Sequence, residues 1–308
     1  MRTRRLVVGP FLYGPPMTSG PEDRFRPFRE RAKAKGIPAD DVERWLTLVR
    51  PCATLASTAD DEFGPVVGRF GGPLLLPDGI PDPGHPFVAS IDLAALPADA
   101  TDLPLPPDGH LLFFALADDQ RDHQSVGSVV HVPVGTQVSQ RDKHAWNVHE
   151  YEEWDREFGK LFEGYPEGEL RARAEVSLPH HTSVFPAGQQ LRADIPGHPL
   201  CDDLVEAWQE TKDGIVQSGE MQIGGFGDEE DVDVDPVDVS VRTALYAVER
   251  GDWERPVSDD PADWVLLADW YAPGLRHREG STLHWVIQRE DLIARRFERT
   301  FTTFAWNP

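Results

Sequence analysis

Two segments of helical periodicity lie near the N-terminus of the chain. In residues 38–50 the apolar positions Val42, Trp45 and Val49 fall on one face of a helix, and an aspartate is placed to cap the start of that helix. The preceding segment, residues 25–35, is rich in basic side chains. We expect these two helices to form an N-terminal helical layer.

From residue 66 the pattern changes to short apolar runs separated by proline, glycine and aspartate. Strands are expected at the Leu-Leu-Leu run of residues 74–76 and at residues 87–93, 110–116 and 126–135. The 28 prolines and 26 glycines of the chain interrupt regular elements, which argues against an all-helical bundle. Gly71 and Gly72 lack the spacing of a phosphate-binding loop, so they predict a bent entry into a strand.

Helical periodicity returns in the second half of the chain. Residues 149–163 and 199–212 each place apolar side chains on one face and acidic side chains on the other, which predicts helices packed against a sheet. Residues 237–250 fit a helix by spacing and a strand by their density of β-branched side chains, so both alternatives stay open.

Two stretches of the chain resemble each other. Each has an apolar strand that ends in an acid, Asp92 or Asp269, followed by an acid-glycine turn at Gly109 or Gly280 and a second apolar strand. This similarity favours two related β-rich halves, although turn chemistry alone produces the same pattern by chance.

These patterns together predict an α+β fold. Two related β-rich halves share a core, with an N-terminal helical layer and amphipathic helices packed on the sheets. We expect a helical segment over residues 1–60 and an α+β domain over residues 61–308, whose halves span about 61–218 and 219–308.

Net charge restricts the class of partner. The formal charge of −23 repels phosphate backbones and anionic lipids, so nucleic acid and membrane surfaces are not expected as partners. This charge is compatible with a basic protein as partner, and it is also compatible with a role in solubility alone.

Cysteine usage and the N-terminal sequence predict a cytoplasmic protein. The two cysteines, Cys52 and Cys201, are too few for a disulfide scaffold and fit reduced thiols. The first residues begin basic and turn apolar like a signal peptide, but prolines interrupt the apolar run. No stretch is long and apolar enough to span a bilayer.

The acidic run at residues 228–235 is the most conspicuous candidate for metal chemistry. Its acids Asp231, Asp233 and Asp235 alternate like the first ligands of a calcium-binding loop, but Pro236 and Arg242 stand where that loop needs glycine and glutamate. A metal-nucleotide site that uses two alternating acids stays an alternative. A solvated acidic loop that offers negative charge to a basic partner is the simpler interpretation.

Histidines and cysteines give no recognisable catalytic pattern. His180 and His181, together with four histidines between residues 123 and 149, lack the helical or strand spacing of a metal site. No nucleophile elbow is present, and the aspartates beside Cys201 would suppress its thiolate. We therefore assign no catalytic residue, metal ligand or cofactor.

Short motifs in one order along the chain resemble the YwqG-like family, a bacterial domain of unknown function. The matching residues are Gly71, Gly72, Pro73, Leu75 or Leu76, Pro77, Ile91, Asp92, Leu93, Gly109, Leu111, Phe113, Phe114, Ile223, Gly224, Gly225, Phe226, Trp264, Leu266, Leu267, Trp285, Ile287, Asp291, Leu292 and Phe297. The chain departs from the family at Ser90 and near Ala268, where glutamine is usual. The resemblance implies a compact α+β protein with β-rich halves, often encoded near secreted toxins, and hence an immunity-type role.

The leading functional hypothesis is a non-enzymatic protein-binding module of the toxin-immunity type. Its expected partner is a basic protein such as a toxin. The candidate binding residues are Gln222, Gly224, Gly225, Phe226, Asp228, Glu229 and Glu230, because a glycine-bearing loop can present backbone and charge together. One alternative is a metal-dependent enzyme or small-ligand binder that uses acidic and histidine residues, and another is a structural scaffold.

Overall fold

The computed structural model describes residues 23–60, 63–117, 124–141, 164–189, 191–229, 233–254, 256–275 and 278–306. Its α-helices are α1 (Arg26–Ala34), α2 (Ala39–Leu46), α4 (Cys201–Gln209), α5 (Pro236–Arg250) and α6 (Arg289–Ile293). Its strands are β1 (Arg50–Ala56), β2 (Val66–Phe70), β3 (Leu74–Pro77), β4 (Phe87–Asp92), β5 (His110–Ala115), β6 (Gly127–Val132), β7 (Val138–Arg141), β8 (Gly168–Ser177), β9 (Ser183–Val184), β10 (Ala193–Asp194), β11 (Met221–Ile223), β12 (Trp264–Ala272), β13 (Ser281–Gln288) and β14 (Phe301–Ala305).

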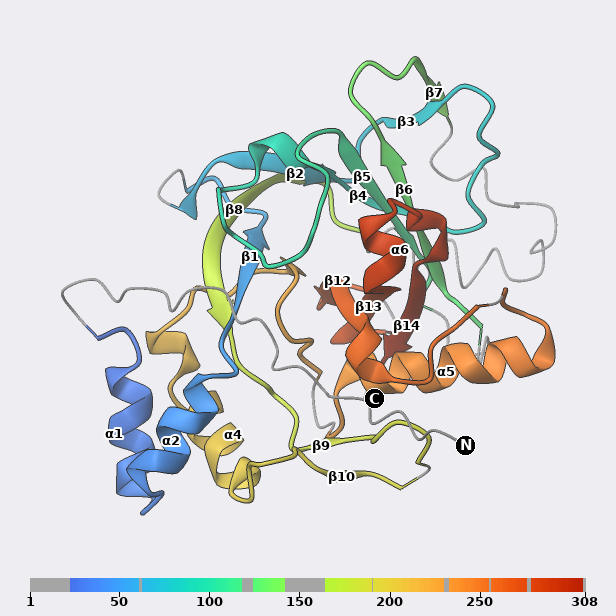
Figure 1. Ribbon diagram of the computed structural model, residues 1–308. Coiled ribbons are helices and arrows are strands. Elements are labelled where there is room, and N and C mark those ends of the chain that lie inside the picture. Colours follow the sequence, from blue (N-terminus) through green and yellow to red (C-terminus); the bar gives the residue numbers. More distant parts are fainter. Residues whose placement is uncertain are drawn as a thin grey trace.

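One large antiparallel sheet dominates the molecule (Figure 1). Its ten strands run in the order β14-β13-β12-β11-β1-β8-β2-β4-β5-β6. Strands β1 and β8 lie in the middle and pair over seven residues, from Arg50 with Ser177 to Ala56 with Arg171. The sheet therefore joins segments from the beginning, middle and end of the chain.

The sheet curls until its two outer strands meet. The Val126 amide, just before β6, donates to the Thr302 carbonyl of β14 at 3.0 Å, and the Thr302 amide donates to Ser125 Oγ at 3.0 Å. At Gly127 an added Cβ would lie 2.4 Å from the Phe114 carbonyl oxygen and 2.8 Å from the Thr302 side chain. Closure of the sheet at this position therefore requires glycine.

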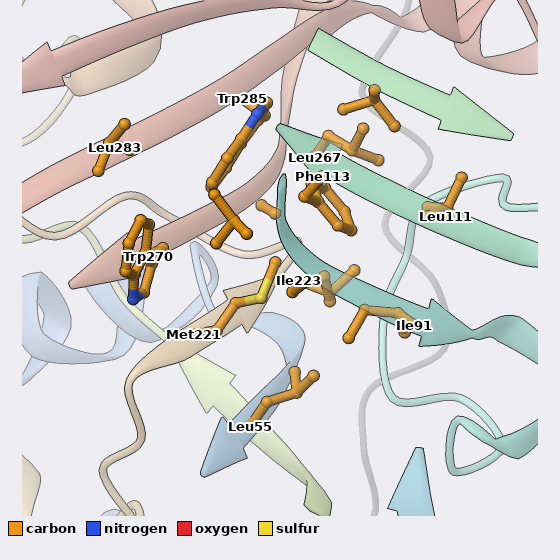
Figure 2. Close-up of a cluster of buried hydrophobic side chains, with 14 of the residues drawn as sticks. Leu55, Ile91, Leu111, Phe113, Met221, Ile223, Leu267, Trp270, Leu283 and Trp285 are labelled. Carbon is orange, nitrogen blue, oxygen red and sulfur yellow. The ribbon is translucent and has the colours of Figure 1, made fainter. Parts of the chain in front are cut away.

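The main hydrophobic core fills the inside of the curled sheet. Figure 2 shows side chains from β1, β4, β5 and β11 to β13 converging there. The Trp285 ring packs edge-on against Phe113 with 5.2 Å between centroids, and the Trp270 ring lies 6.0 Å from Phe70. Because strand residues alternate between faces, the neighbours of these core residues point to the outside of the sheet.

Four of the five α-helices of the described residues occupy two separate places outside this core. Helices α1, α2 and α4 pack on one another around Phe28, Trp45 and Trp208, and form their own cluster at one end of the molecule (Figure 1). Helix α5 covers the outer face of β12 to β14, where Val241 and other small apolar side chains meet a patch that includes Phe301.

The expected α+β fold is wrong, because the structure is mostly β. In the described part of the chain there are five α-helices, and three of these pack together rather than forming a layer on the sheet. The two central strands were missed in the sequence because they give a weak apolar signal. Strand β8 reads GELRARAEVS and β1 reads RPCATLA, with the small side chains of Ala172 and Ala53 in the core and charged or polar side chains between the apolar positions.

Several local expectations are confirmed within the corrected fold. Helices α1, α2 and α4 and strands β3 to β6 form where periodicity placed them. The ambiguous segment is helix α5, because Asp235 caps it by accepting the Val237 amide at 2.9 Å and Gly251 ends it with φ 82°. Residues 149–163 lie outside the described residues, and the division of the chain near residues 60 and 218 stays a prediction.

Candidate functional site

A row of polar side chains crosses the outer face of the sheet. Each member is the direct cross-strand partner of the next, over strands β8, β1, β11, β12, β13 and β14. The row consists of Arg173, Thr54, Gln222, Asp269, His284 and Thr303. A continuous polar row on a sheet whose other face is a hydrophobic core needs a cover that satisfies its buried members.

Residues 224–229, which we call the site loop, cover the middle of this row. The Gln222 side-chain amide donates to the carbonyls of Gly224 at 2.8 Å and Phe226 at 2.9 Å. The Phe226 amide donates to Ser177 Oγ of β8 at 2.8 Å, and the Gly224 amide donates to the Leu267 carbonyl at 3.2 Å. The loop backbone is therefore fixed by side chains of the sheet that it covers.

The paired glycines let the loop turn close to the sheet. Gly224 and Gly225 have φ of 72° and 75°, in the left-handed region that favours glycine. A Cβ at Gly225 would lie 3.0 Å from both Cys52 Cβ and Ser177 Cβ. The glycines thus serve backbone geometry and close approach.

Arg50 fastens the loop from β1. Its Nη1 donates to the Gly225 carbonyl at 3.0 Å, and its guanidinium binds both carboxylate oxygens of Asp102 at 3.0 Å. The same guanidinium lies 5.5 Å from the centre of the Phe226 ring. One arginine therefore contacts both the backbone of the loop and the loop's aromatic side chain, Phe226.

Beneath the loop lies a buried acid-histidine cluster formed by Asp269, His284 and Glu229. His284 is fully buried, and its Nε2 lies 2.9 Å from Glu229 Oε1, whose side chain is only 7% exposed. Asp269 accepts the Asp228 amide at 3.4 Å. Three ionisable groups thus share a region with little water.

Burial perturbs the ionisation of this cluster. It raises the pKa of Asp269 to about 7, an effect that the neighbouring His284 only partly opposes. Burial alone would lower the pKa of His284, but the carboxylates of Glu229, Asp269 and Asp235 outweigh it and raise that pKa above its ordinary value. The acidic neighbours therefore favour the charged form of this imidazole.

Asp228 is the acid of the loop that faces solvent. Its side chain is 52% exposed, and its carboxylate lies 3.0 Å from Lys212 Nζ and 3.4 Å from His180 Nδ1. Burial alone would raise the pKa of Asp228, but His180 and Lys212 lower it. Burial lowers the pKa of His180 to about 4, so this imidazole is neutral at neutral pH.

The structure brings the predicted site residues into one place with different surroundings. Gln222, Gly224 and Gly225 hold the backbone of the loop, while Asp228 faces outward and Glu229 turns inward to His284. Glu230 lies outside the described residues. Sequence reasoning missed the supporting residues, which come from strands distant in the chain: Arg50, Ser177, Asp269 and His284.

The other candidates for metal or nucleophilic chemistry are placed as follows. In the described ranges no three His, Cys, Asp or Glu side chains are arranged to hold a metal ion. Asp233 is 69% exposed and lies 3.7 Å from Arg192, while Asp231 is outside those ranges. Both cysteines are free and buried, and burial raises the pKa of Cys52 to about 12 and that of Cys201 in the same direction. Both thiols are thus protonated at neutral pH.

The ionisation of Asp269 predicts a pH-dependent stability change in Asp269→Asn. The folded-state pKa of Asp269 lies above its ordinary value of 3.8, so its contribution to stability is full below pH 3.8 and is lost as the pH rises through about 7. Asparagine keeps the shape without the charge. We expect the substitution to be more favourable at pH 8 than at pH 4, by about 1 to 3 kcal/mol in the free energy of unfolding from urea titrations.

The matched control is Asp259→Asn at an exposed position, where we expect no difference between the two pH values. An Asp269→Asn effect that is equal at both pH values would show that the fold does not disfavour the ionised carboxylate.

Comparison with known proteins gives a family without a known activity. In the part of the chain that the structure describes, no helix is long and apolar enough to cross a membrane. No curated protein matches the sequence. The family model described as Domain of unknown function (DUF1963) matches residues 68–306, a span that contains eight of the ten strands of the main sheet, part of β2 and the whole site loop. Since this match covers well over half of the sequence, the chain belongs to the DUF1963 family.

Proposed function

We propose that the chain is a non-enzymatic protein-binding module of the toxin-immunity type, and that the site loop binds a basic protein. The observation that carries this proposal is the fixed, half-exposed carboxylate of Asp228. Gln222, Ser177 and Arg50 all bond to the loop. A recognition loop that is ordered before binding loses less conformational entropy when the partner docks.

The charge of the chain supports a basic partner. A net charge of −23 steers cationic proteins toward the molecule, and Asp233 adds an exposed carboxylate near the loop in sequence. We assign contact with the basic partner to Phe226 and Asp228, and also to Glu230, which lies two positions after Asp228 in the sequence. Gln222, Gly224, Gly225 and Glu229 are assigned to holding the loop in its binding conformation.

We further propose that the chain is a YwqG-like bacterial protein of the cytoplasm. The ordered short motifs support the family assignment, and several of them fall in the fold where packing is tight. Trp285, Phe113 and Ile223 are core residues, and Gly224 and Gly225 form the turn of the site loop. The two free cysteines agree with a reducing compartment.

The test is direct binding between the purified chain and basic proteins encoded by neighbouring genes, together with growth rescue when such a protein is toxic. We expect Asp228→Asn to weaken binding about tenfold, as the loss of one charge-assisted contact of about 1.4 kcal/mol would do. Asp259→Asn, at an exposed position elsewhere, should leave the affinity unchanged.

Circular dichroism of both variants checks that they are folded. If no neighbouring basic protein binds and none is neutralised, the proposed function is wrong.

A second candidate is an enzyme or small-ligand binder. The observation that favours it is two perturbed groups near the loop: burial raises the pKa of Asp269, beneath the loop, to about 7 and lowers the pKa of His180, beside Asp228, to about 4. Perturbed ionisable groups gather at functional sites more often than elsewhere. Stoichiometric zinc, manganese or iron in the purified protein would favour this candidate over protein binding.

A further inference from the structure

We propose that His284 is a proton-operated latch, which holds the site loop on the sheet while its imidazole is charged and releases the loop when that charge is lost. The latch itself is a property of the fold. Its consequence, a pH-dependent affinity for a partner, rests on the proposed function.

The site loop contacts this imidazole through Glu229 and passes close to it at Gly227. Nε2 lies 2.9 Å from Glu229 at the end of the loop, and an ideal Cβ on Gly227 would lie 3.4 Å from Nδ1. His284 is itself fully buried in the middle of β13, so it cannot turn away to solvent. Its charge therefore acts directly on the loop that covers it.

Carboxylates surround His284 on several sides. Glu229 faces it from the loop, Asp269 from the adjacent strand β12, and Asp235 acts on it from the start of α5, while the outward-facing Asp228 interacts with it electrostatically. Two further ionisable groups, Lys212 and His180, contact Asp228. Lys212 compensates the half-exposed Asp228, and among the described residues His284 is a cation that interacts with the buried acids Glu229 and Asp269.

Loss of the proton leaves Glu229 and Asp269, which both interact with His284, without this neighbouring positive charge. Ionised groups in a region of low dielectric repel strongly, and an unpaired buried carboxylate seeks water. Glu229 can reach water only if the loop moves, and the left-handed glycines at 224 and 225 provide the flexible start of such a movement.

The loop is the element that gives way, because its attachments are weaker than those of the sheet. Strands β12 and β13 are joined by a ladder that runs from Trp264 with Gln288 to Ala272 with Ser281. The middle of the loop is held mainly by side-chain hydrogen bonds, such as those from Gln222 and to Ser177. Charge repulsion at His284 is therefore relieved by opening the loop.

The direction of the pH response follows from the shift at His284. Its folded-state pKa is raised by the carboxylates against the opposing effect of burial, so its contribution is full below the ordinary pKa of 6.5 and is lost as the pH rises through the folded-state value. Asp269, whose pKa burial raises to about 7, gains negative charge in the same direction. Both changes favour release of the site loop from the sheet as the pH rises.

Hydrogen exchange tests the latch without a partner. The amides of Phe226 and Asp228 donate to Ser177 and Asp269 when the loop is closed. We expect their protection factors, each taken relative to the intrinsic rate at the same pH, to fall at least about tenfold between about pH 6 and about pH 9. Amides in the ladder between β12 and β13 should keep their protection over this range.

His284→Gln should give loop protection that is already weak at about pH 6, with only the smaller pH dependence that ionisation of Asp269 leaves. His110→Gln replaces an exposed histidine on β5, and it should reproduce the wild-type profile. Glu229→Gln provides a second, milder variant if His284→Gln does not fold, and we expect its loop protection to be reduced at pH 6 with a flatter pH profile.

Flat wild-type protection across this range, or a His284→Gln profile equal to wild type, would overturn the latch. These outcomes separate the latch from the proposed function. If a basic partner binds at Asp228 but the loop protection does not change with pH, only the latch is refuted. If the loop protection changes with pH but no neighbouring basic protein binds, the latch is supported and the proposed function is refuted.

Discussion

Trp285→Ala should lower the free energy of unfolding by about 3 to 5 kcal/mol, the usual cost of deleting a large buried aromatic side chain. The Trp285 ring is fully buried and packs edge-on against Phe113 at 5.2 Å. Its indole N–H donates to the Phe114 carbonyl at 3.1 Å, which links β13 to β5 across the interior. The substitution therefore removes packing inside the curled sheet together with the hydrogen bond that links β13 to β5.

Equilibrium unfolding in urea measures this loss. Tyr271→Ala is the matched control, because Tyr271 is an aromatic residue on the adjacent strand β12 with 45% of its surface exposed. We expect the control to cost less than about 1 kcal/mol. Equal losses in the two variants would mean that the interior is not packed around Trp285.

Gly127→Val should destabilise the fold by at least about 3 kcal/mol, because it places a branched side chain where the curled sheet closes. Even a Cβ at this position would lie 2.4 Å from the Phe114 carbonyl oxygen, and backbone atoms cannot yield as a flexible side chain can. The nearby Thr302 side chain at 2.8 Å blocks the other direction. The variant must separate β6 from its neighbours in order to fit.

Gly84→Val controls for the change from glycine to valine. No atom lies within 4 Å of an added Cβ at Gly84, and its φ is outside the left-handed region. We expect this control to change the melting temperature by only a few degrees, and Gly127→Val to lower it far more. Similar melting temperatures for the two variants would show that closure at Thr302 contributes little to stability.

The sequence predicted individual elements better than the way they assemble. Helix α2 was recognisable because Val42 and Trp45 repeat at helical spacing, and β5 because it is almost wholly apolar. Strand β8 alternates small and charged residues, such as Ala172 and Arg173, and its pairing with β1 joins positions more than a hundred residues apart. Such pairing is decided by tertiary packing, so the mostly β architecture could not be seen in local patterns.

The candidate site was predictable only in part, for the same reason. The Gly-Gly-Phe sequence and the acids after it marked the loop, since glycine pairs and charge are visible in one short stretch. The inward turn of Glu229 depends on His284, which lies on a strand 55 positions further along the chain. The sequence predicted that a strand ends at Asp269. The position of Asp269 beneath the loop follows from the register of the sheet, which cannot be predicted from the sequence alone.

The meeting of Val126 with Thr302 has a consequence for how the protein behaves in a crowded cell. The edge strands of open sheets carry unpaired amides and carbonyls, which can pair with strands of other molecules and so start aggregation. Here part of each edge is covered, where the Val126 amide meets the Thr302 carbonyl and the Thr302 amide meets Ser125 Oγ. The edge of β6 is therefore most exposed to aggregation during synthesis, after β6 has been made and before the last strand, β14, leaves the ribosome and covers part of it.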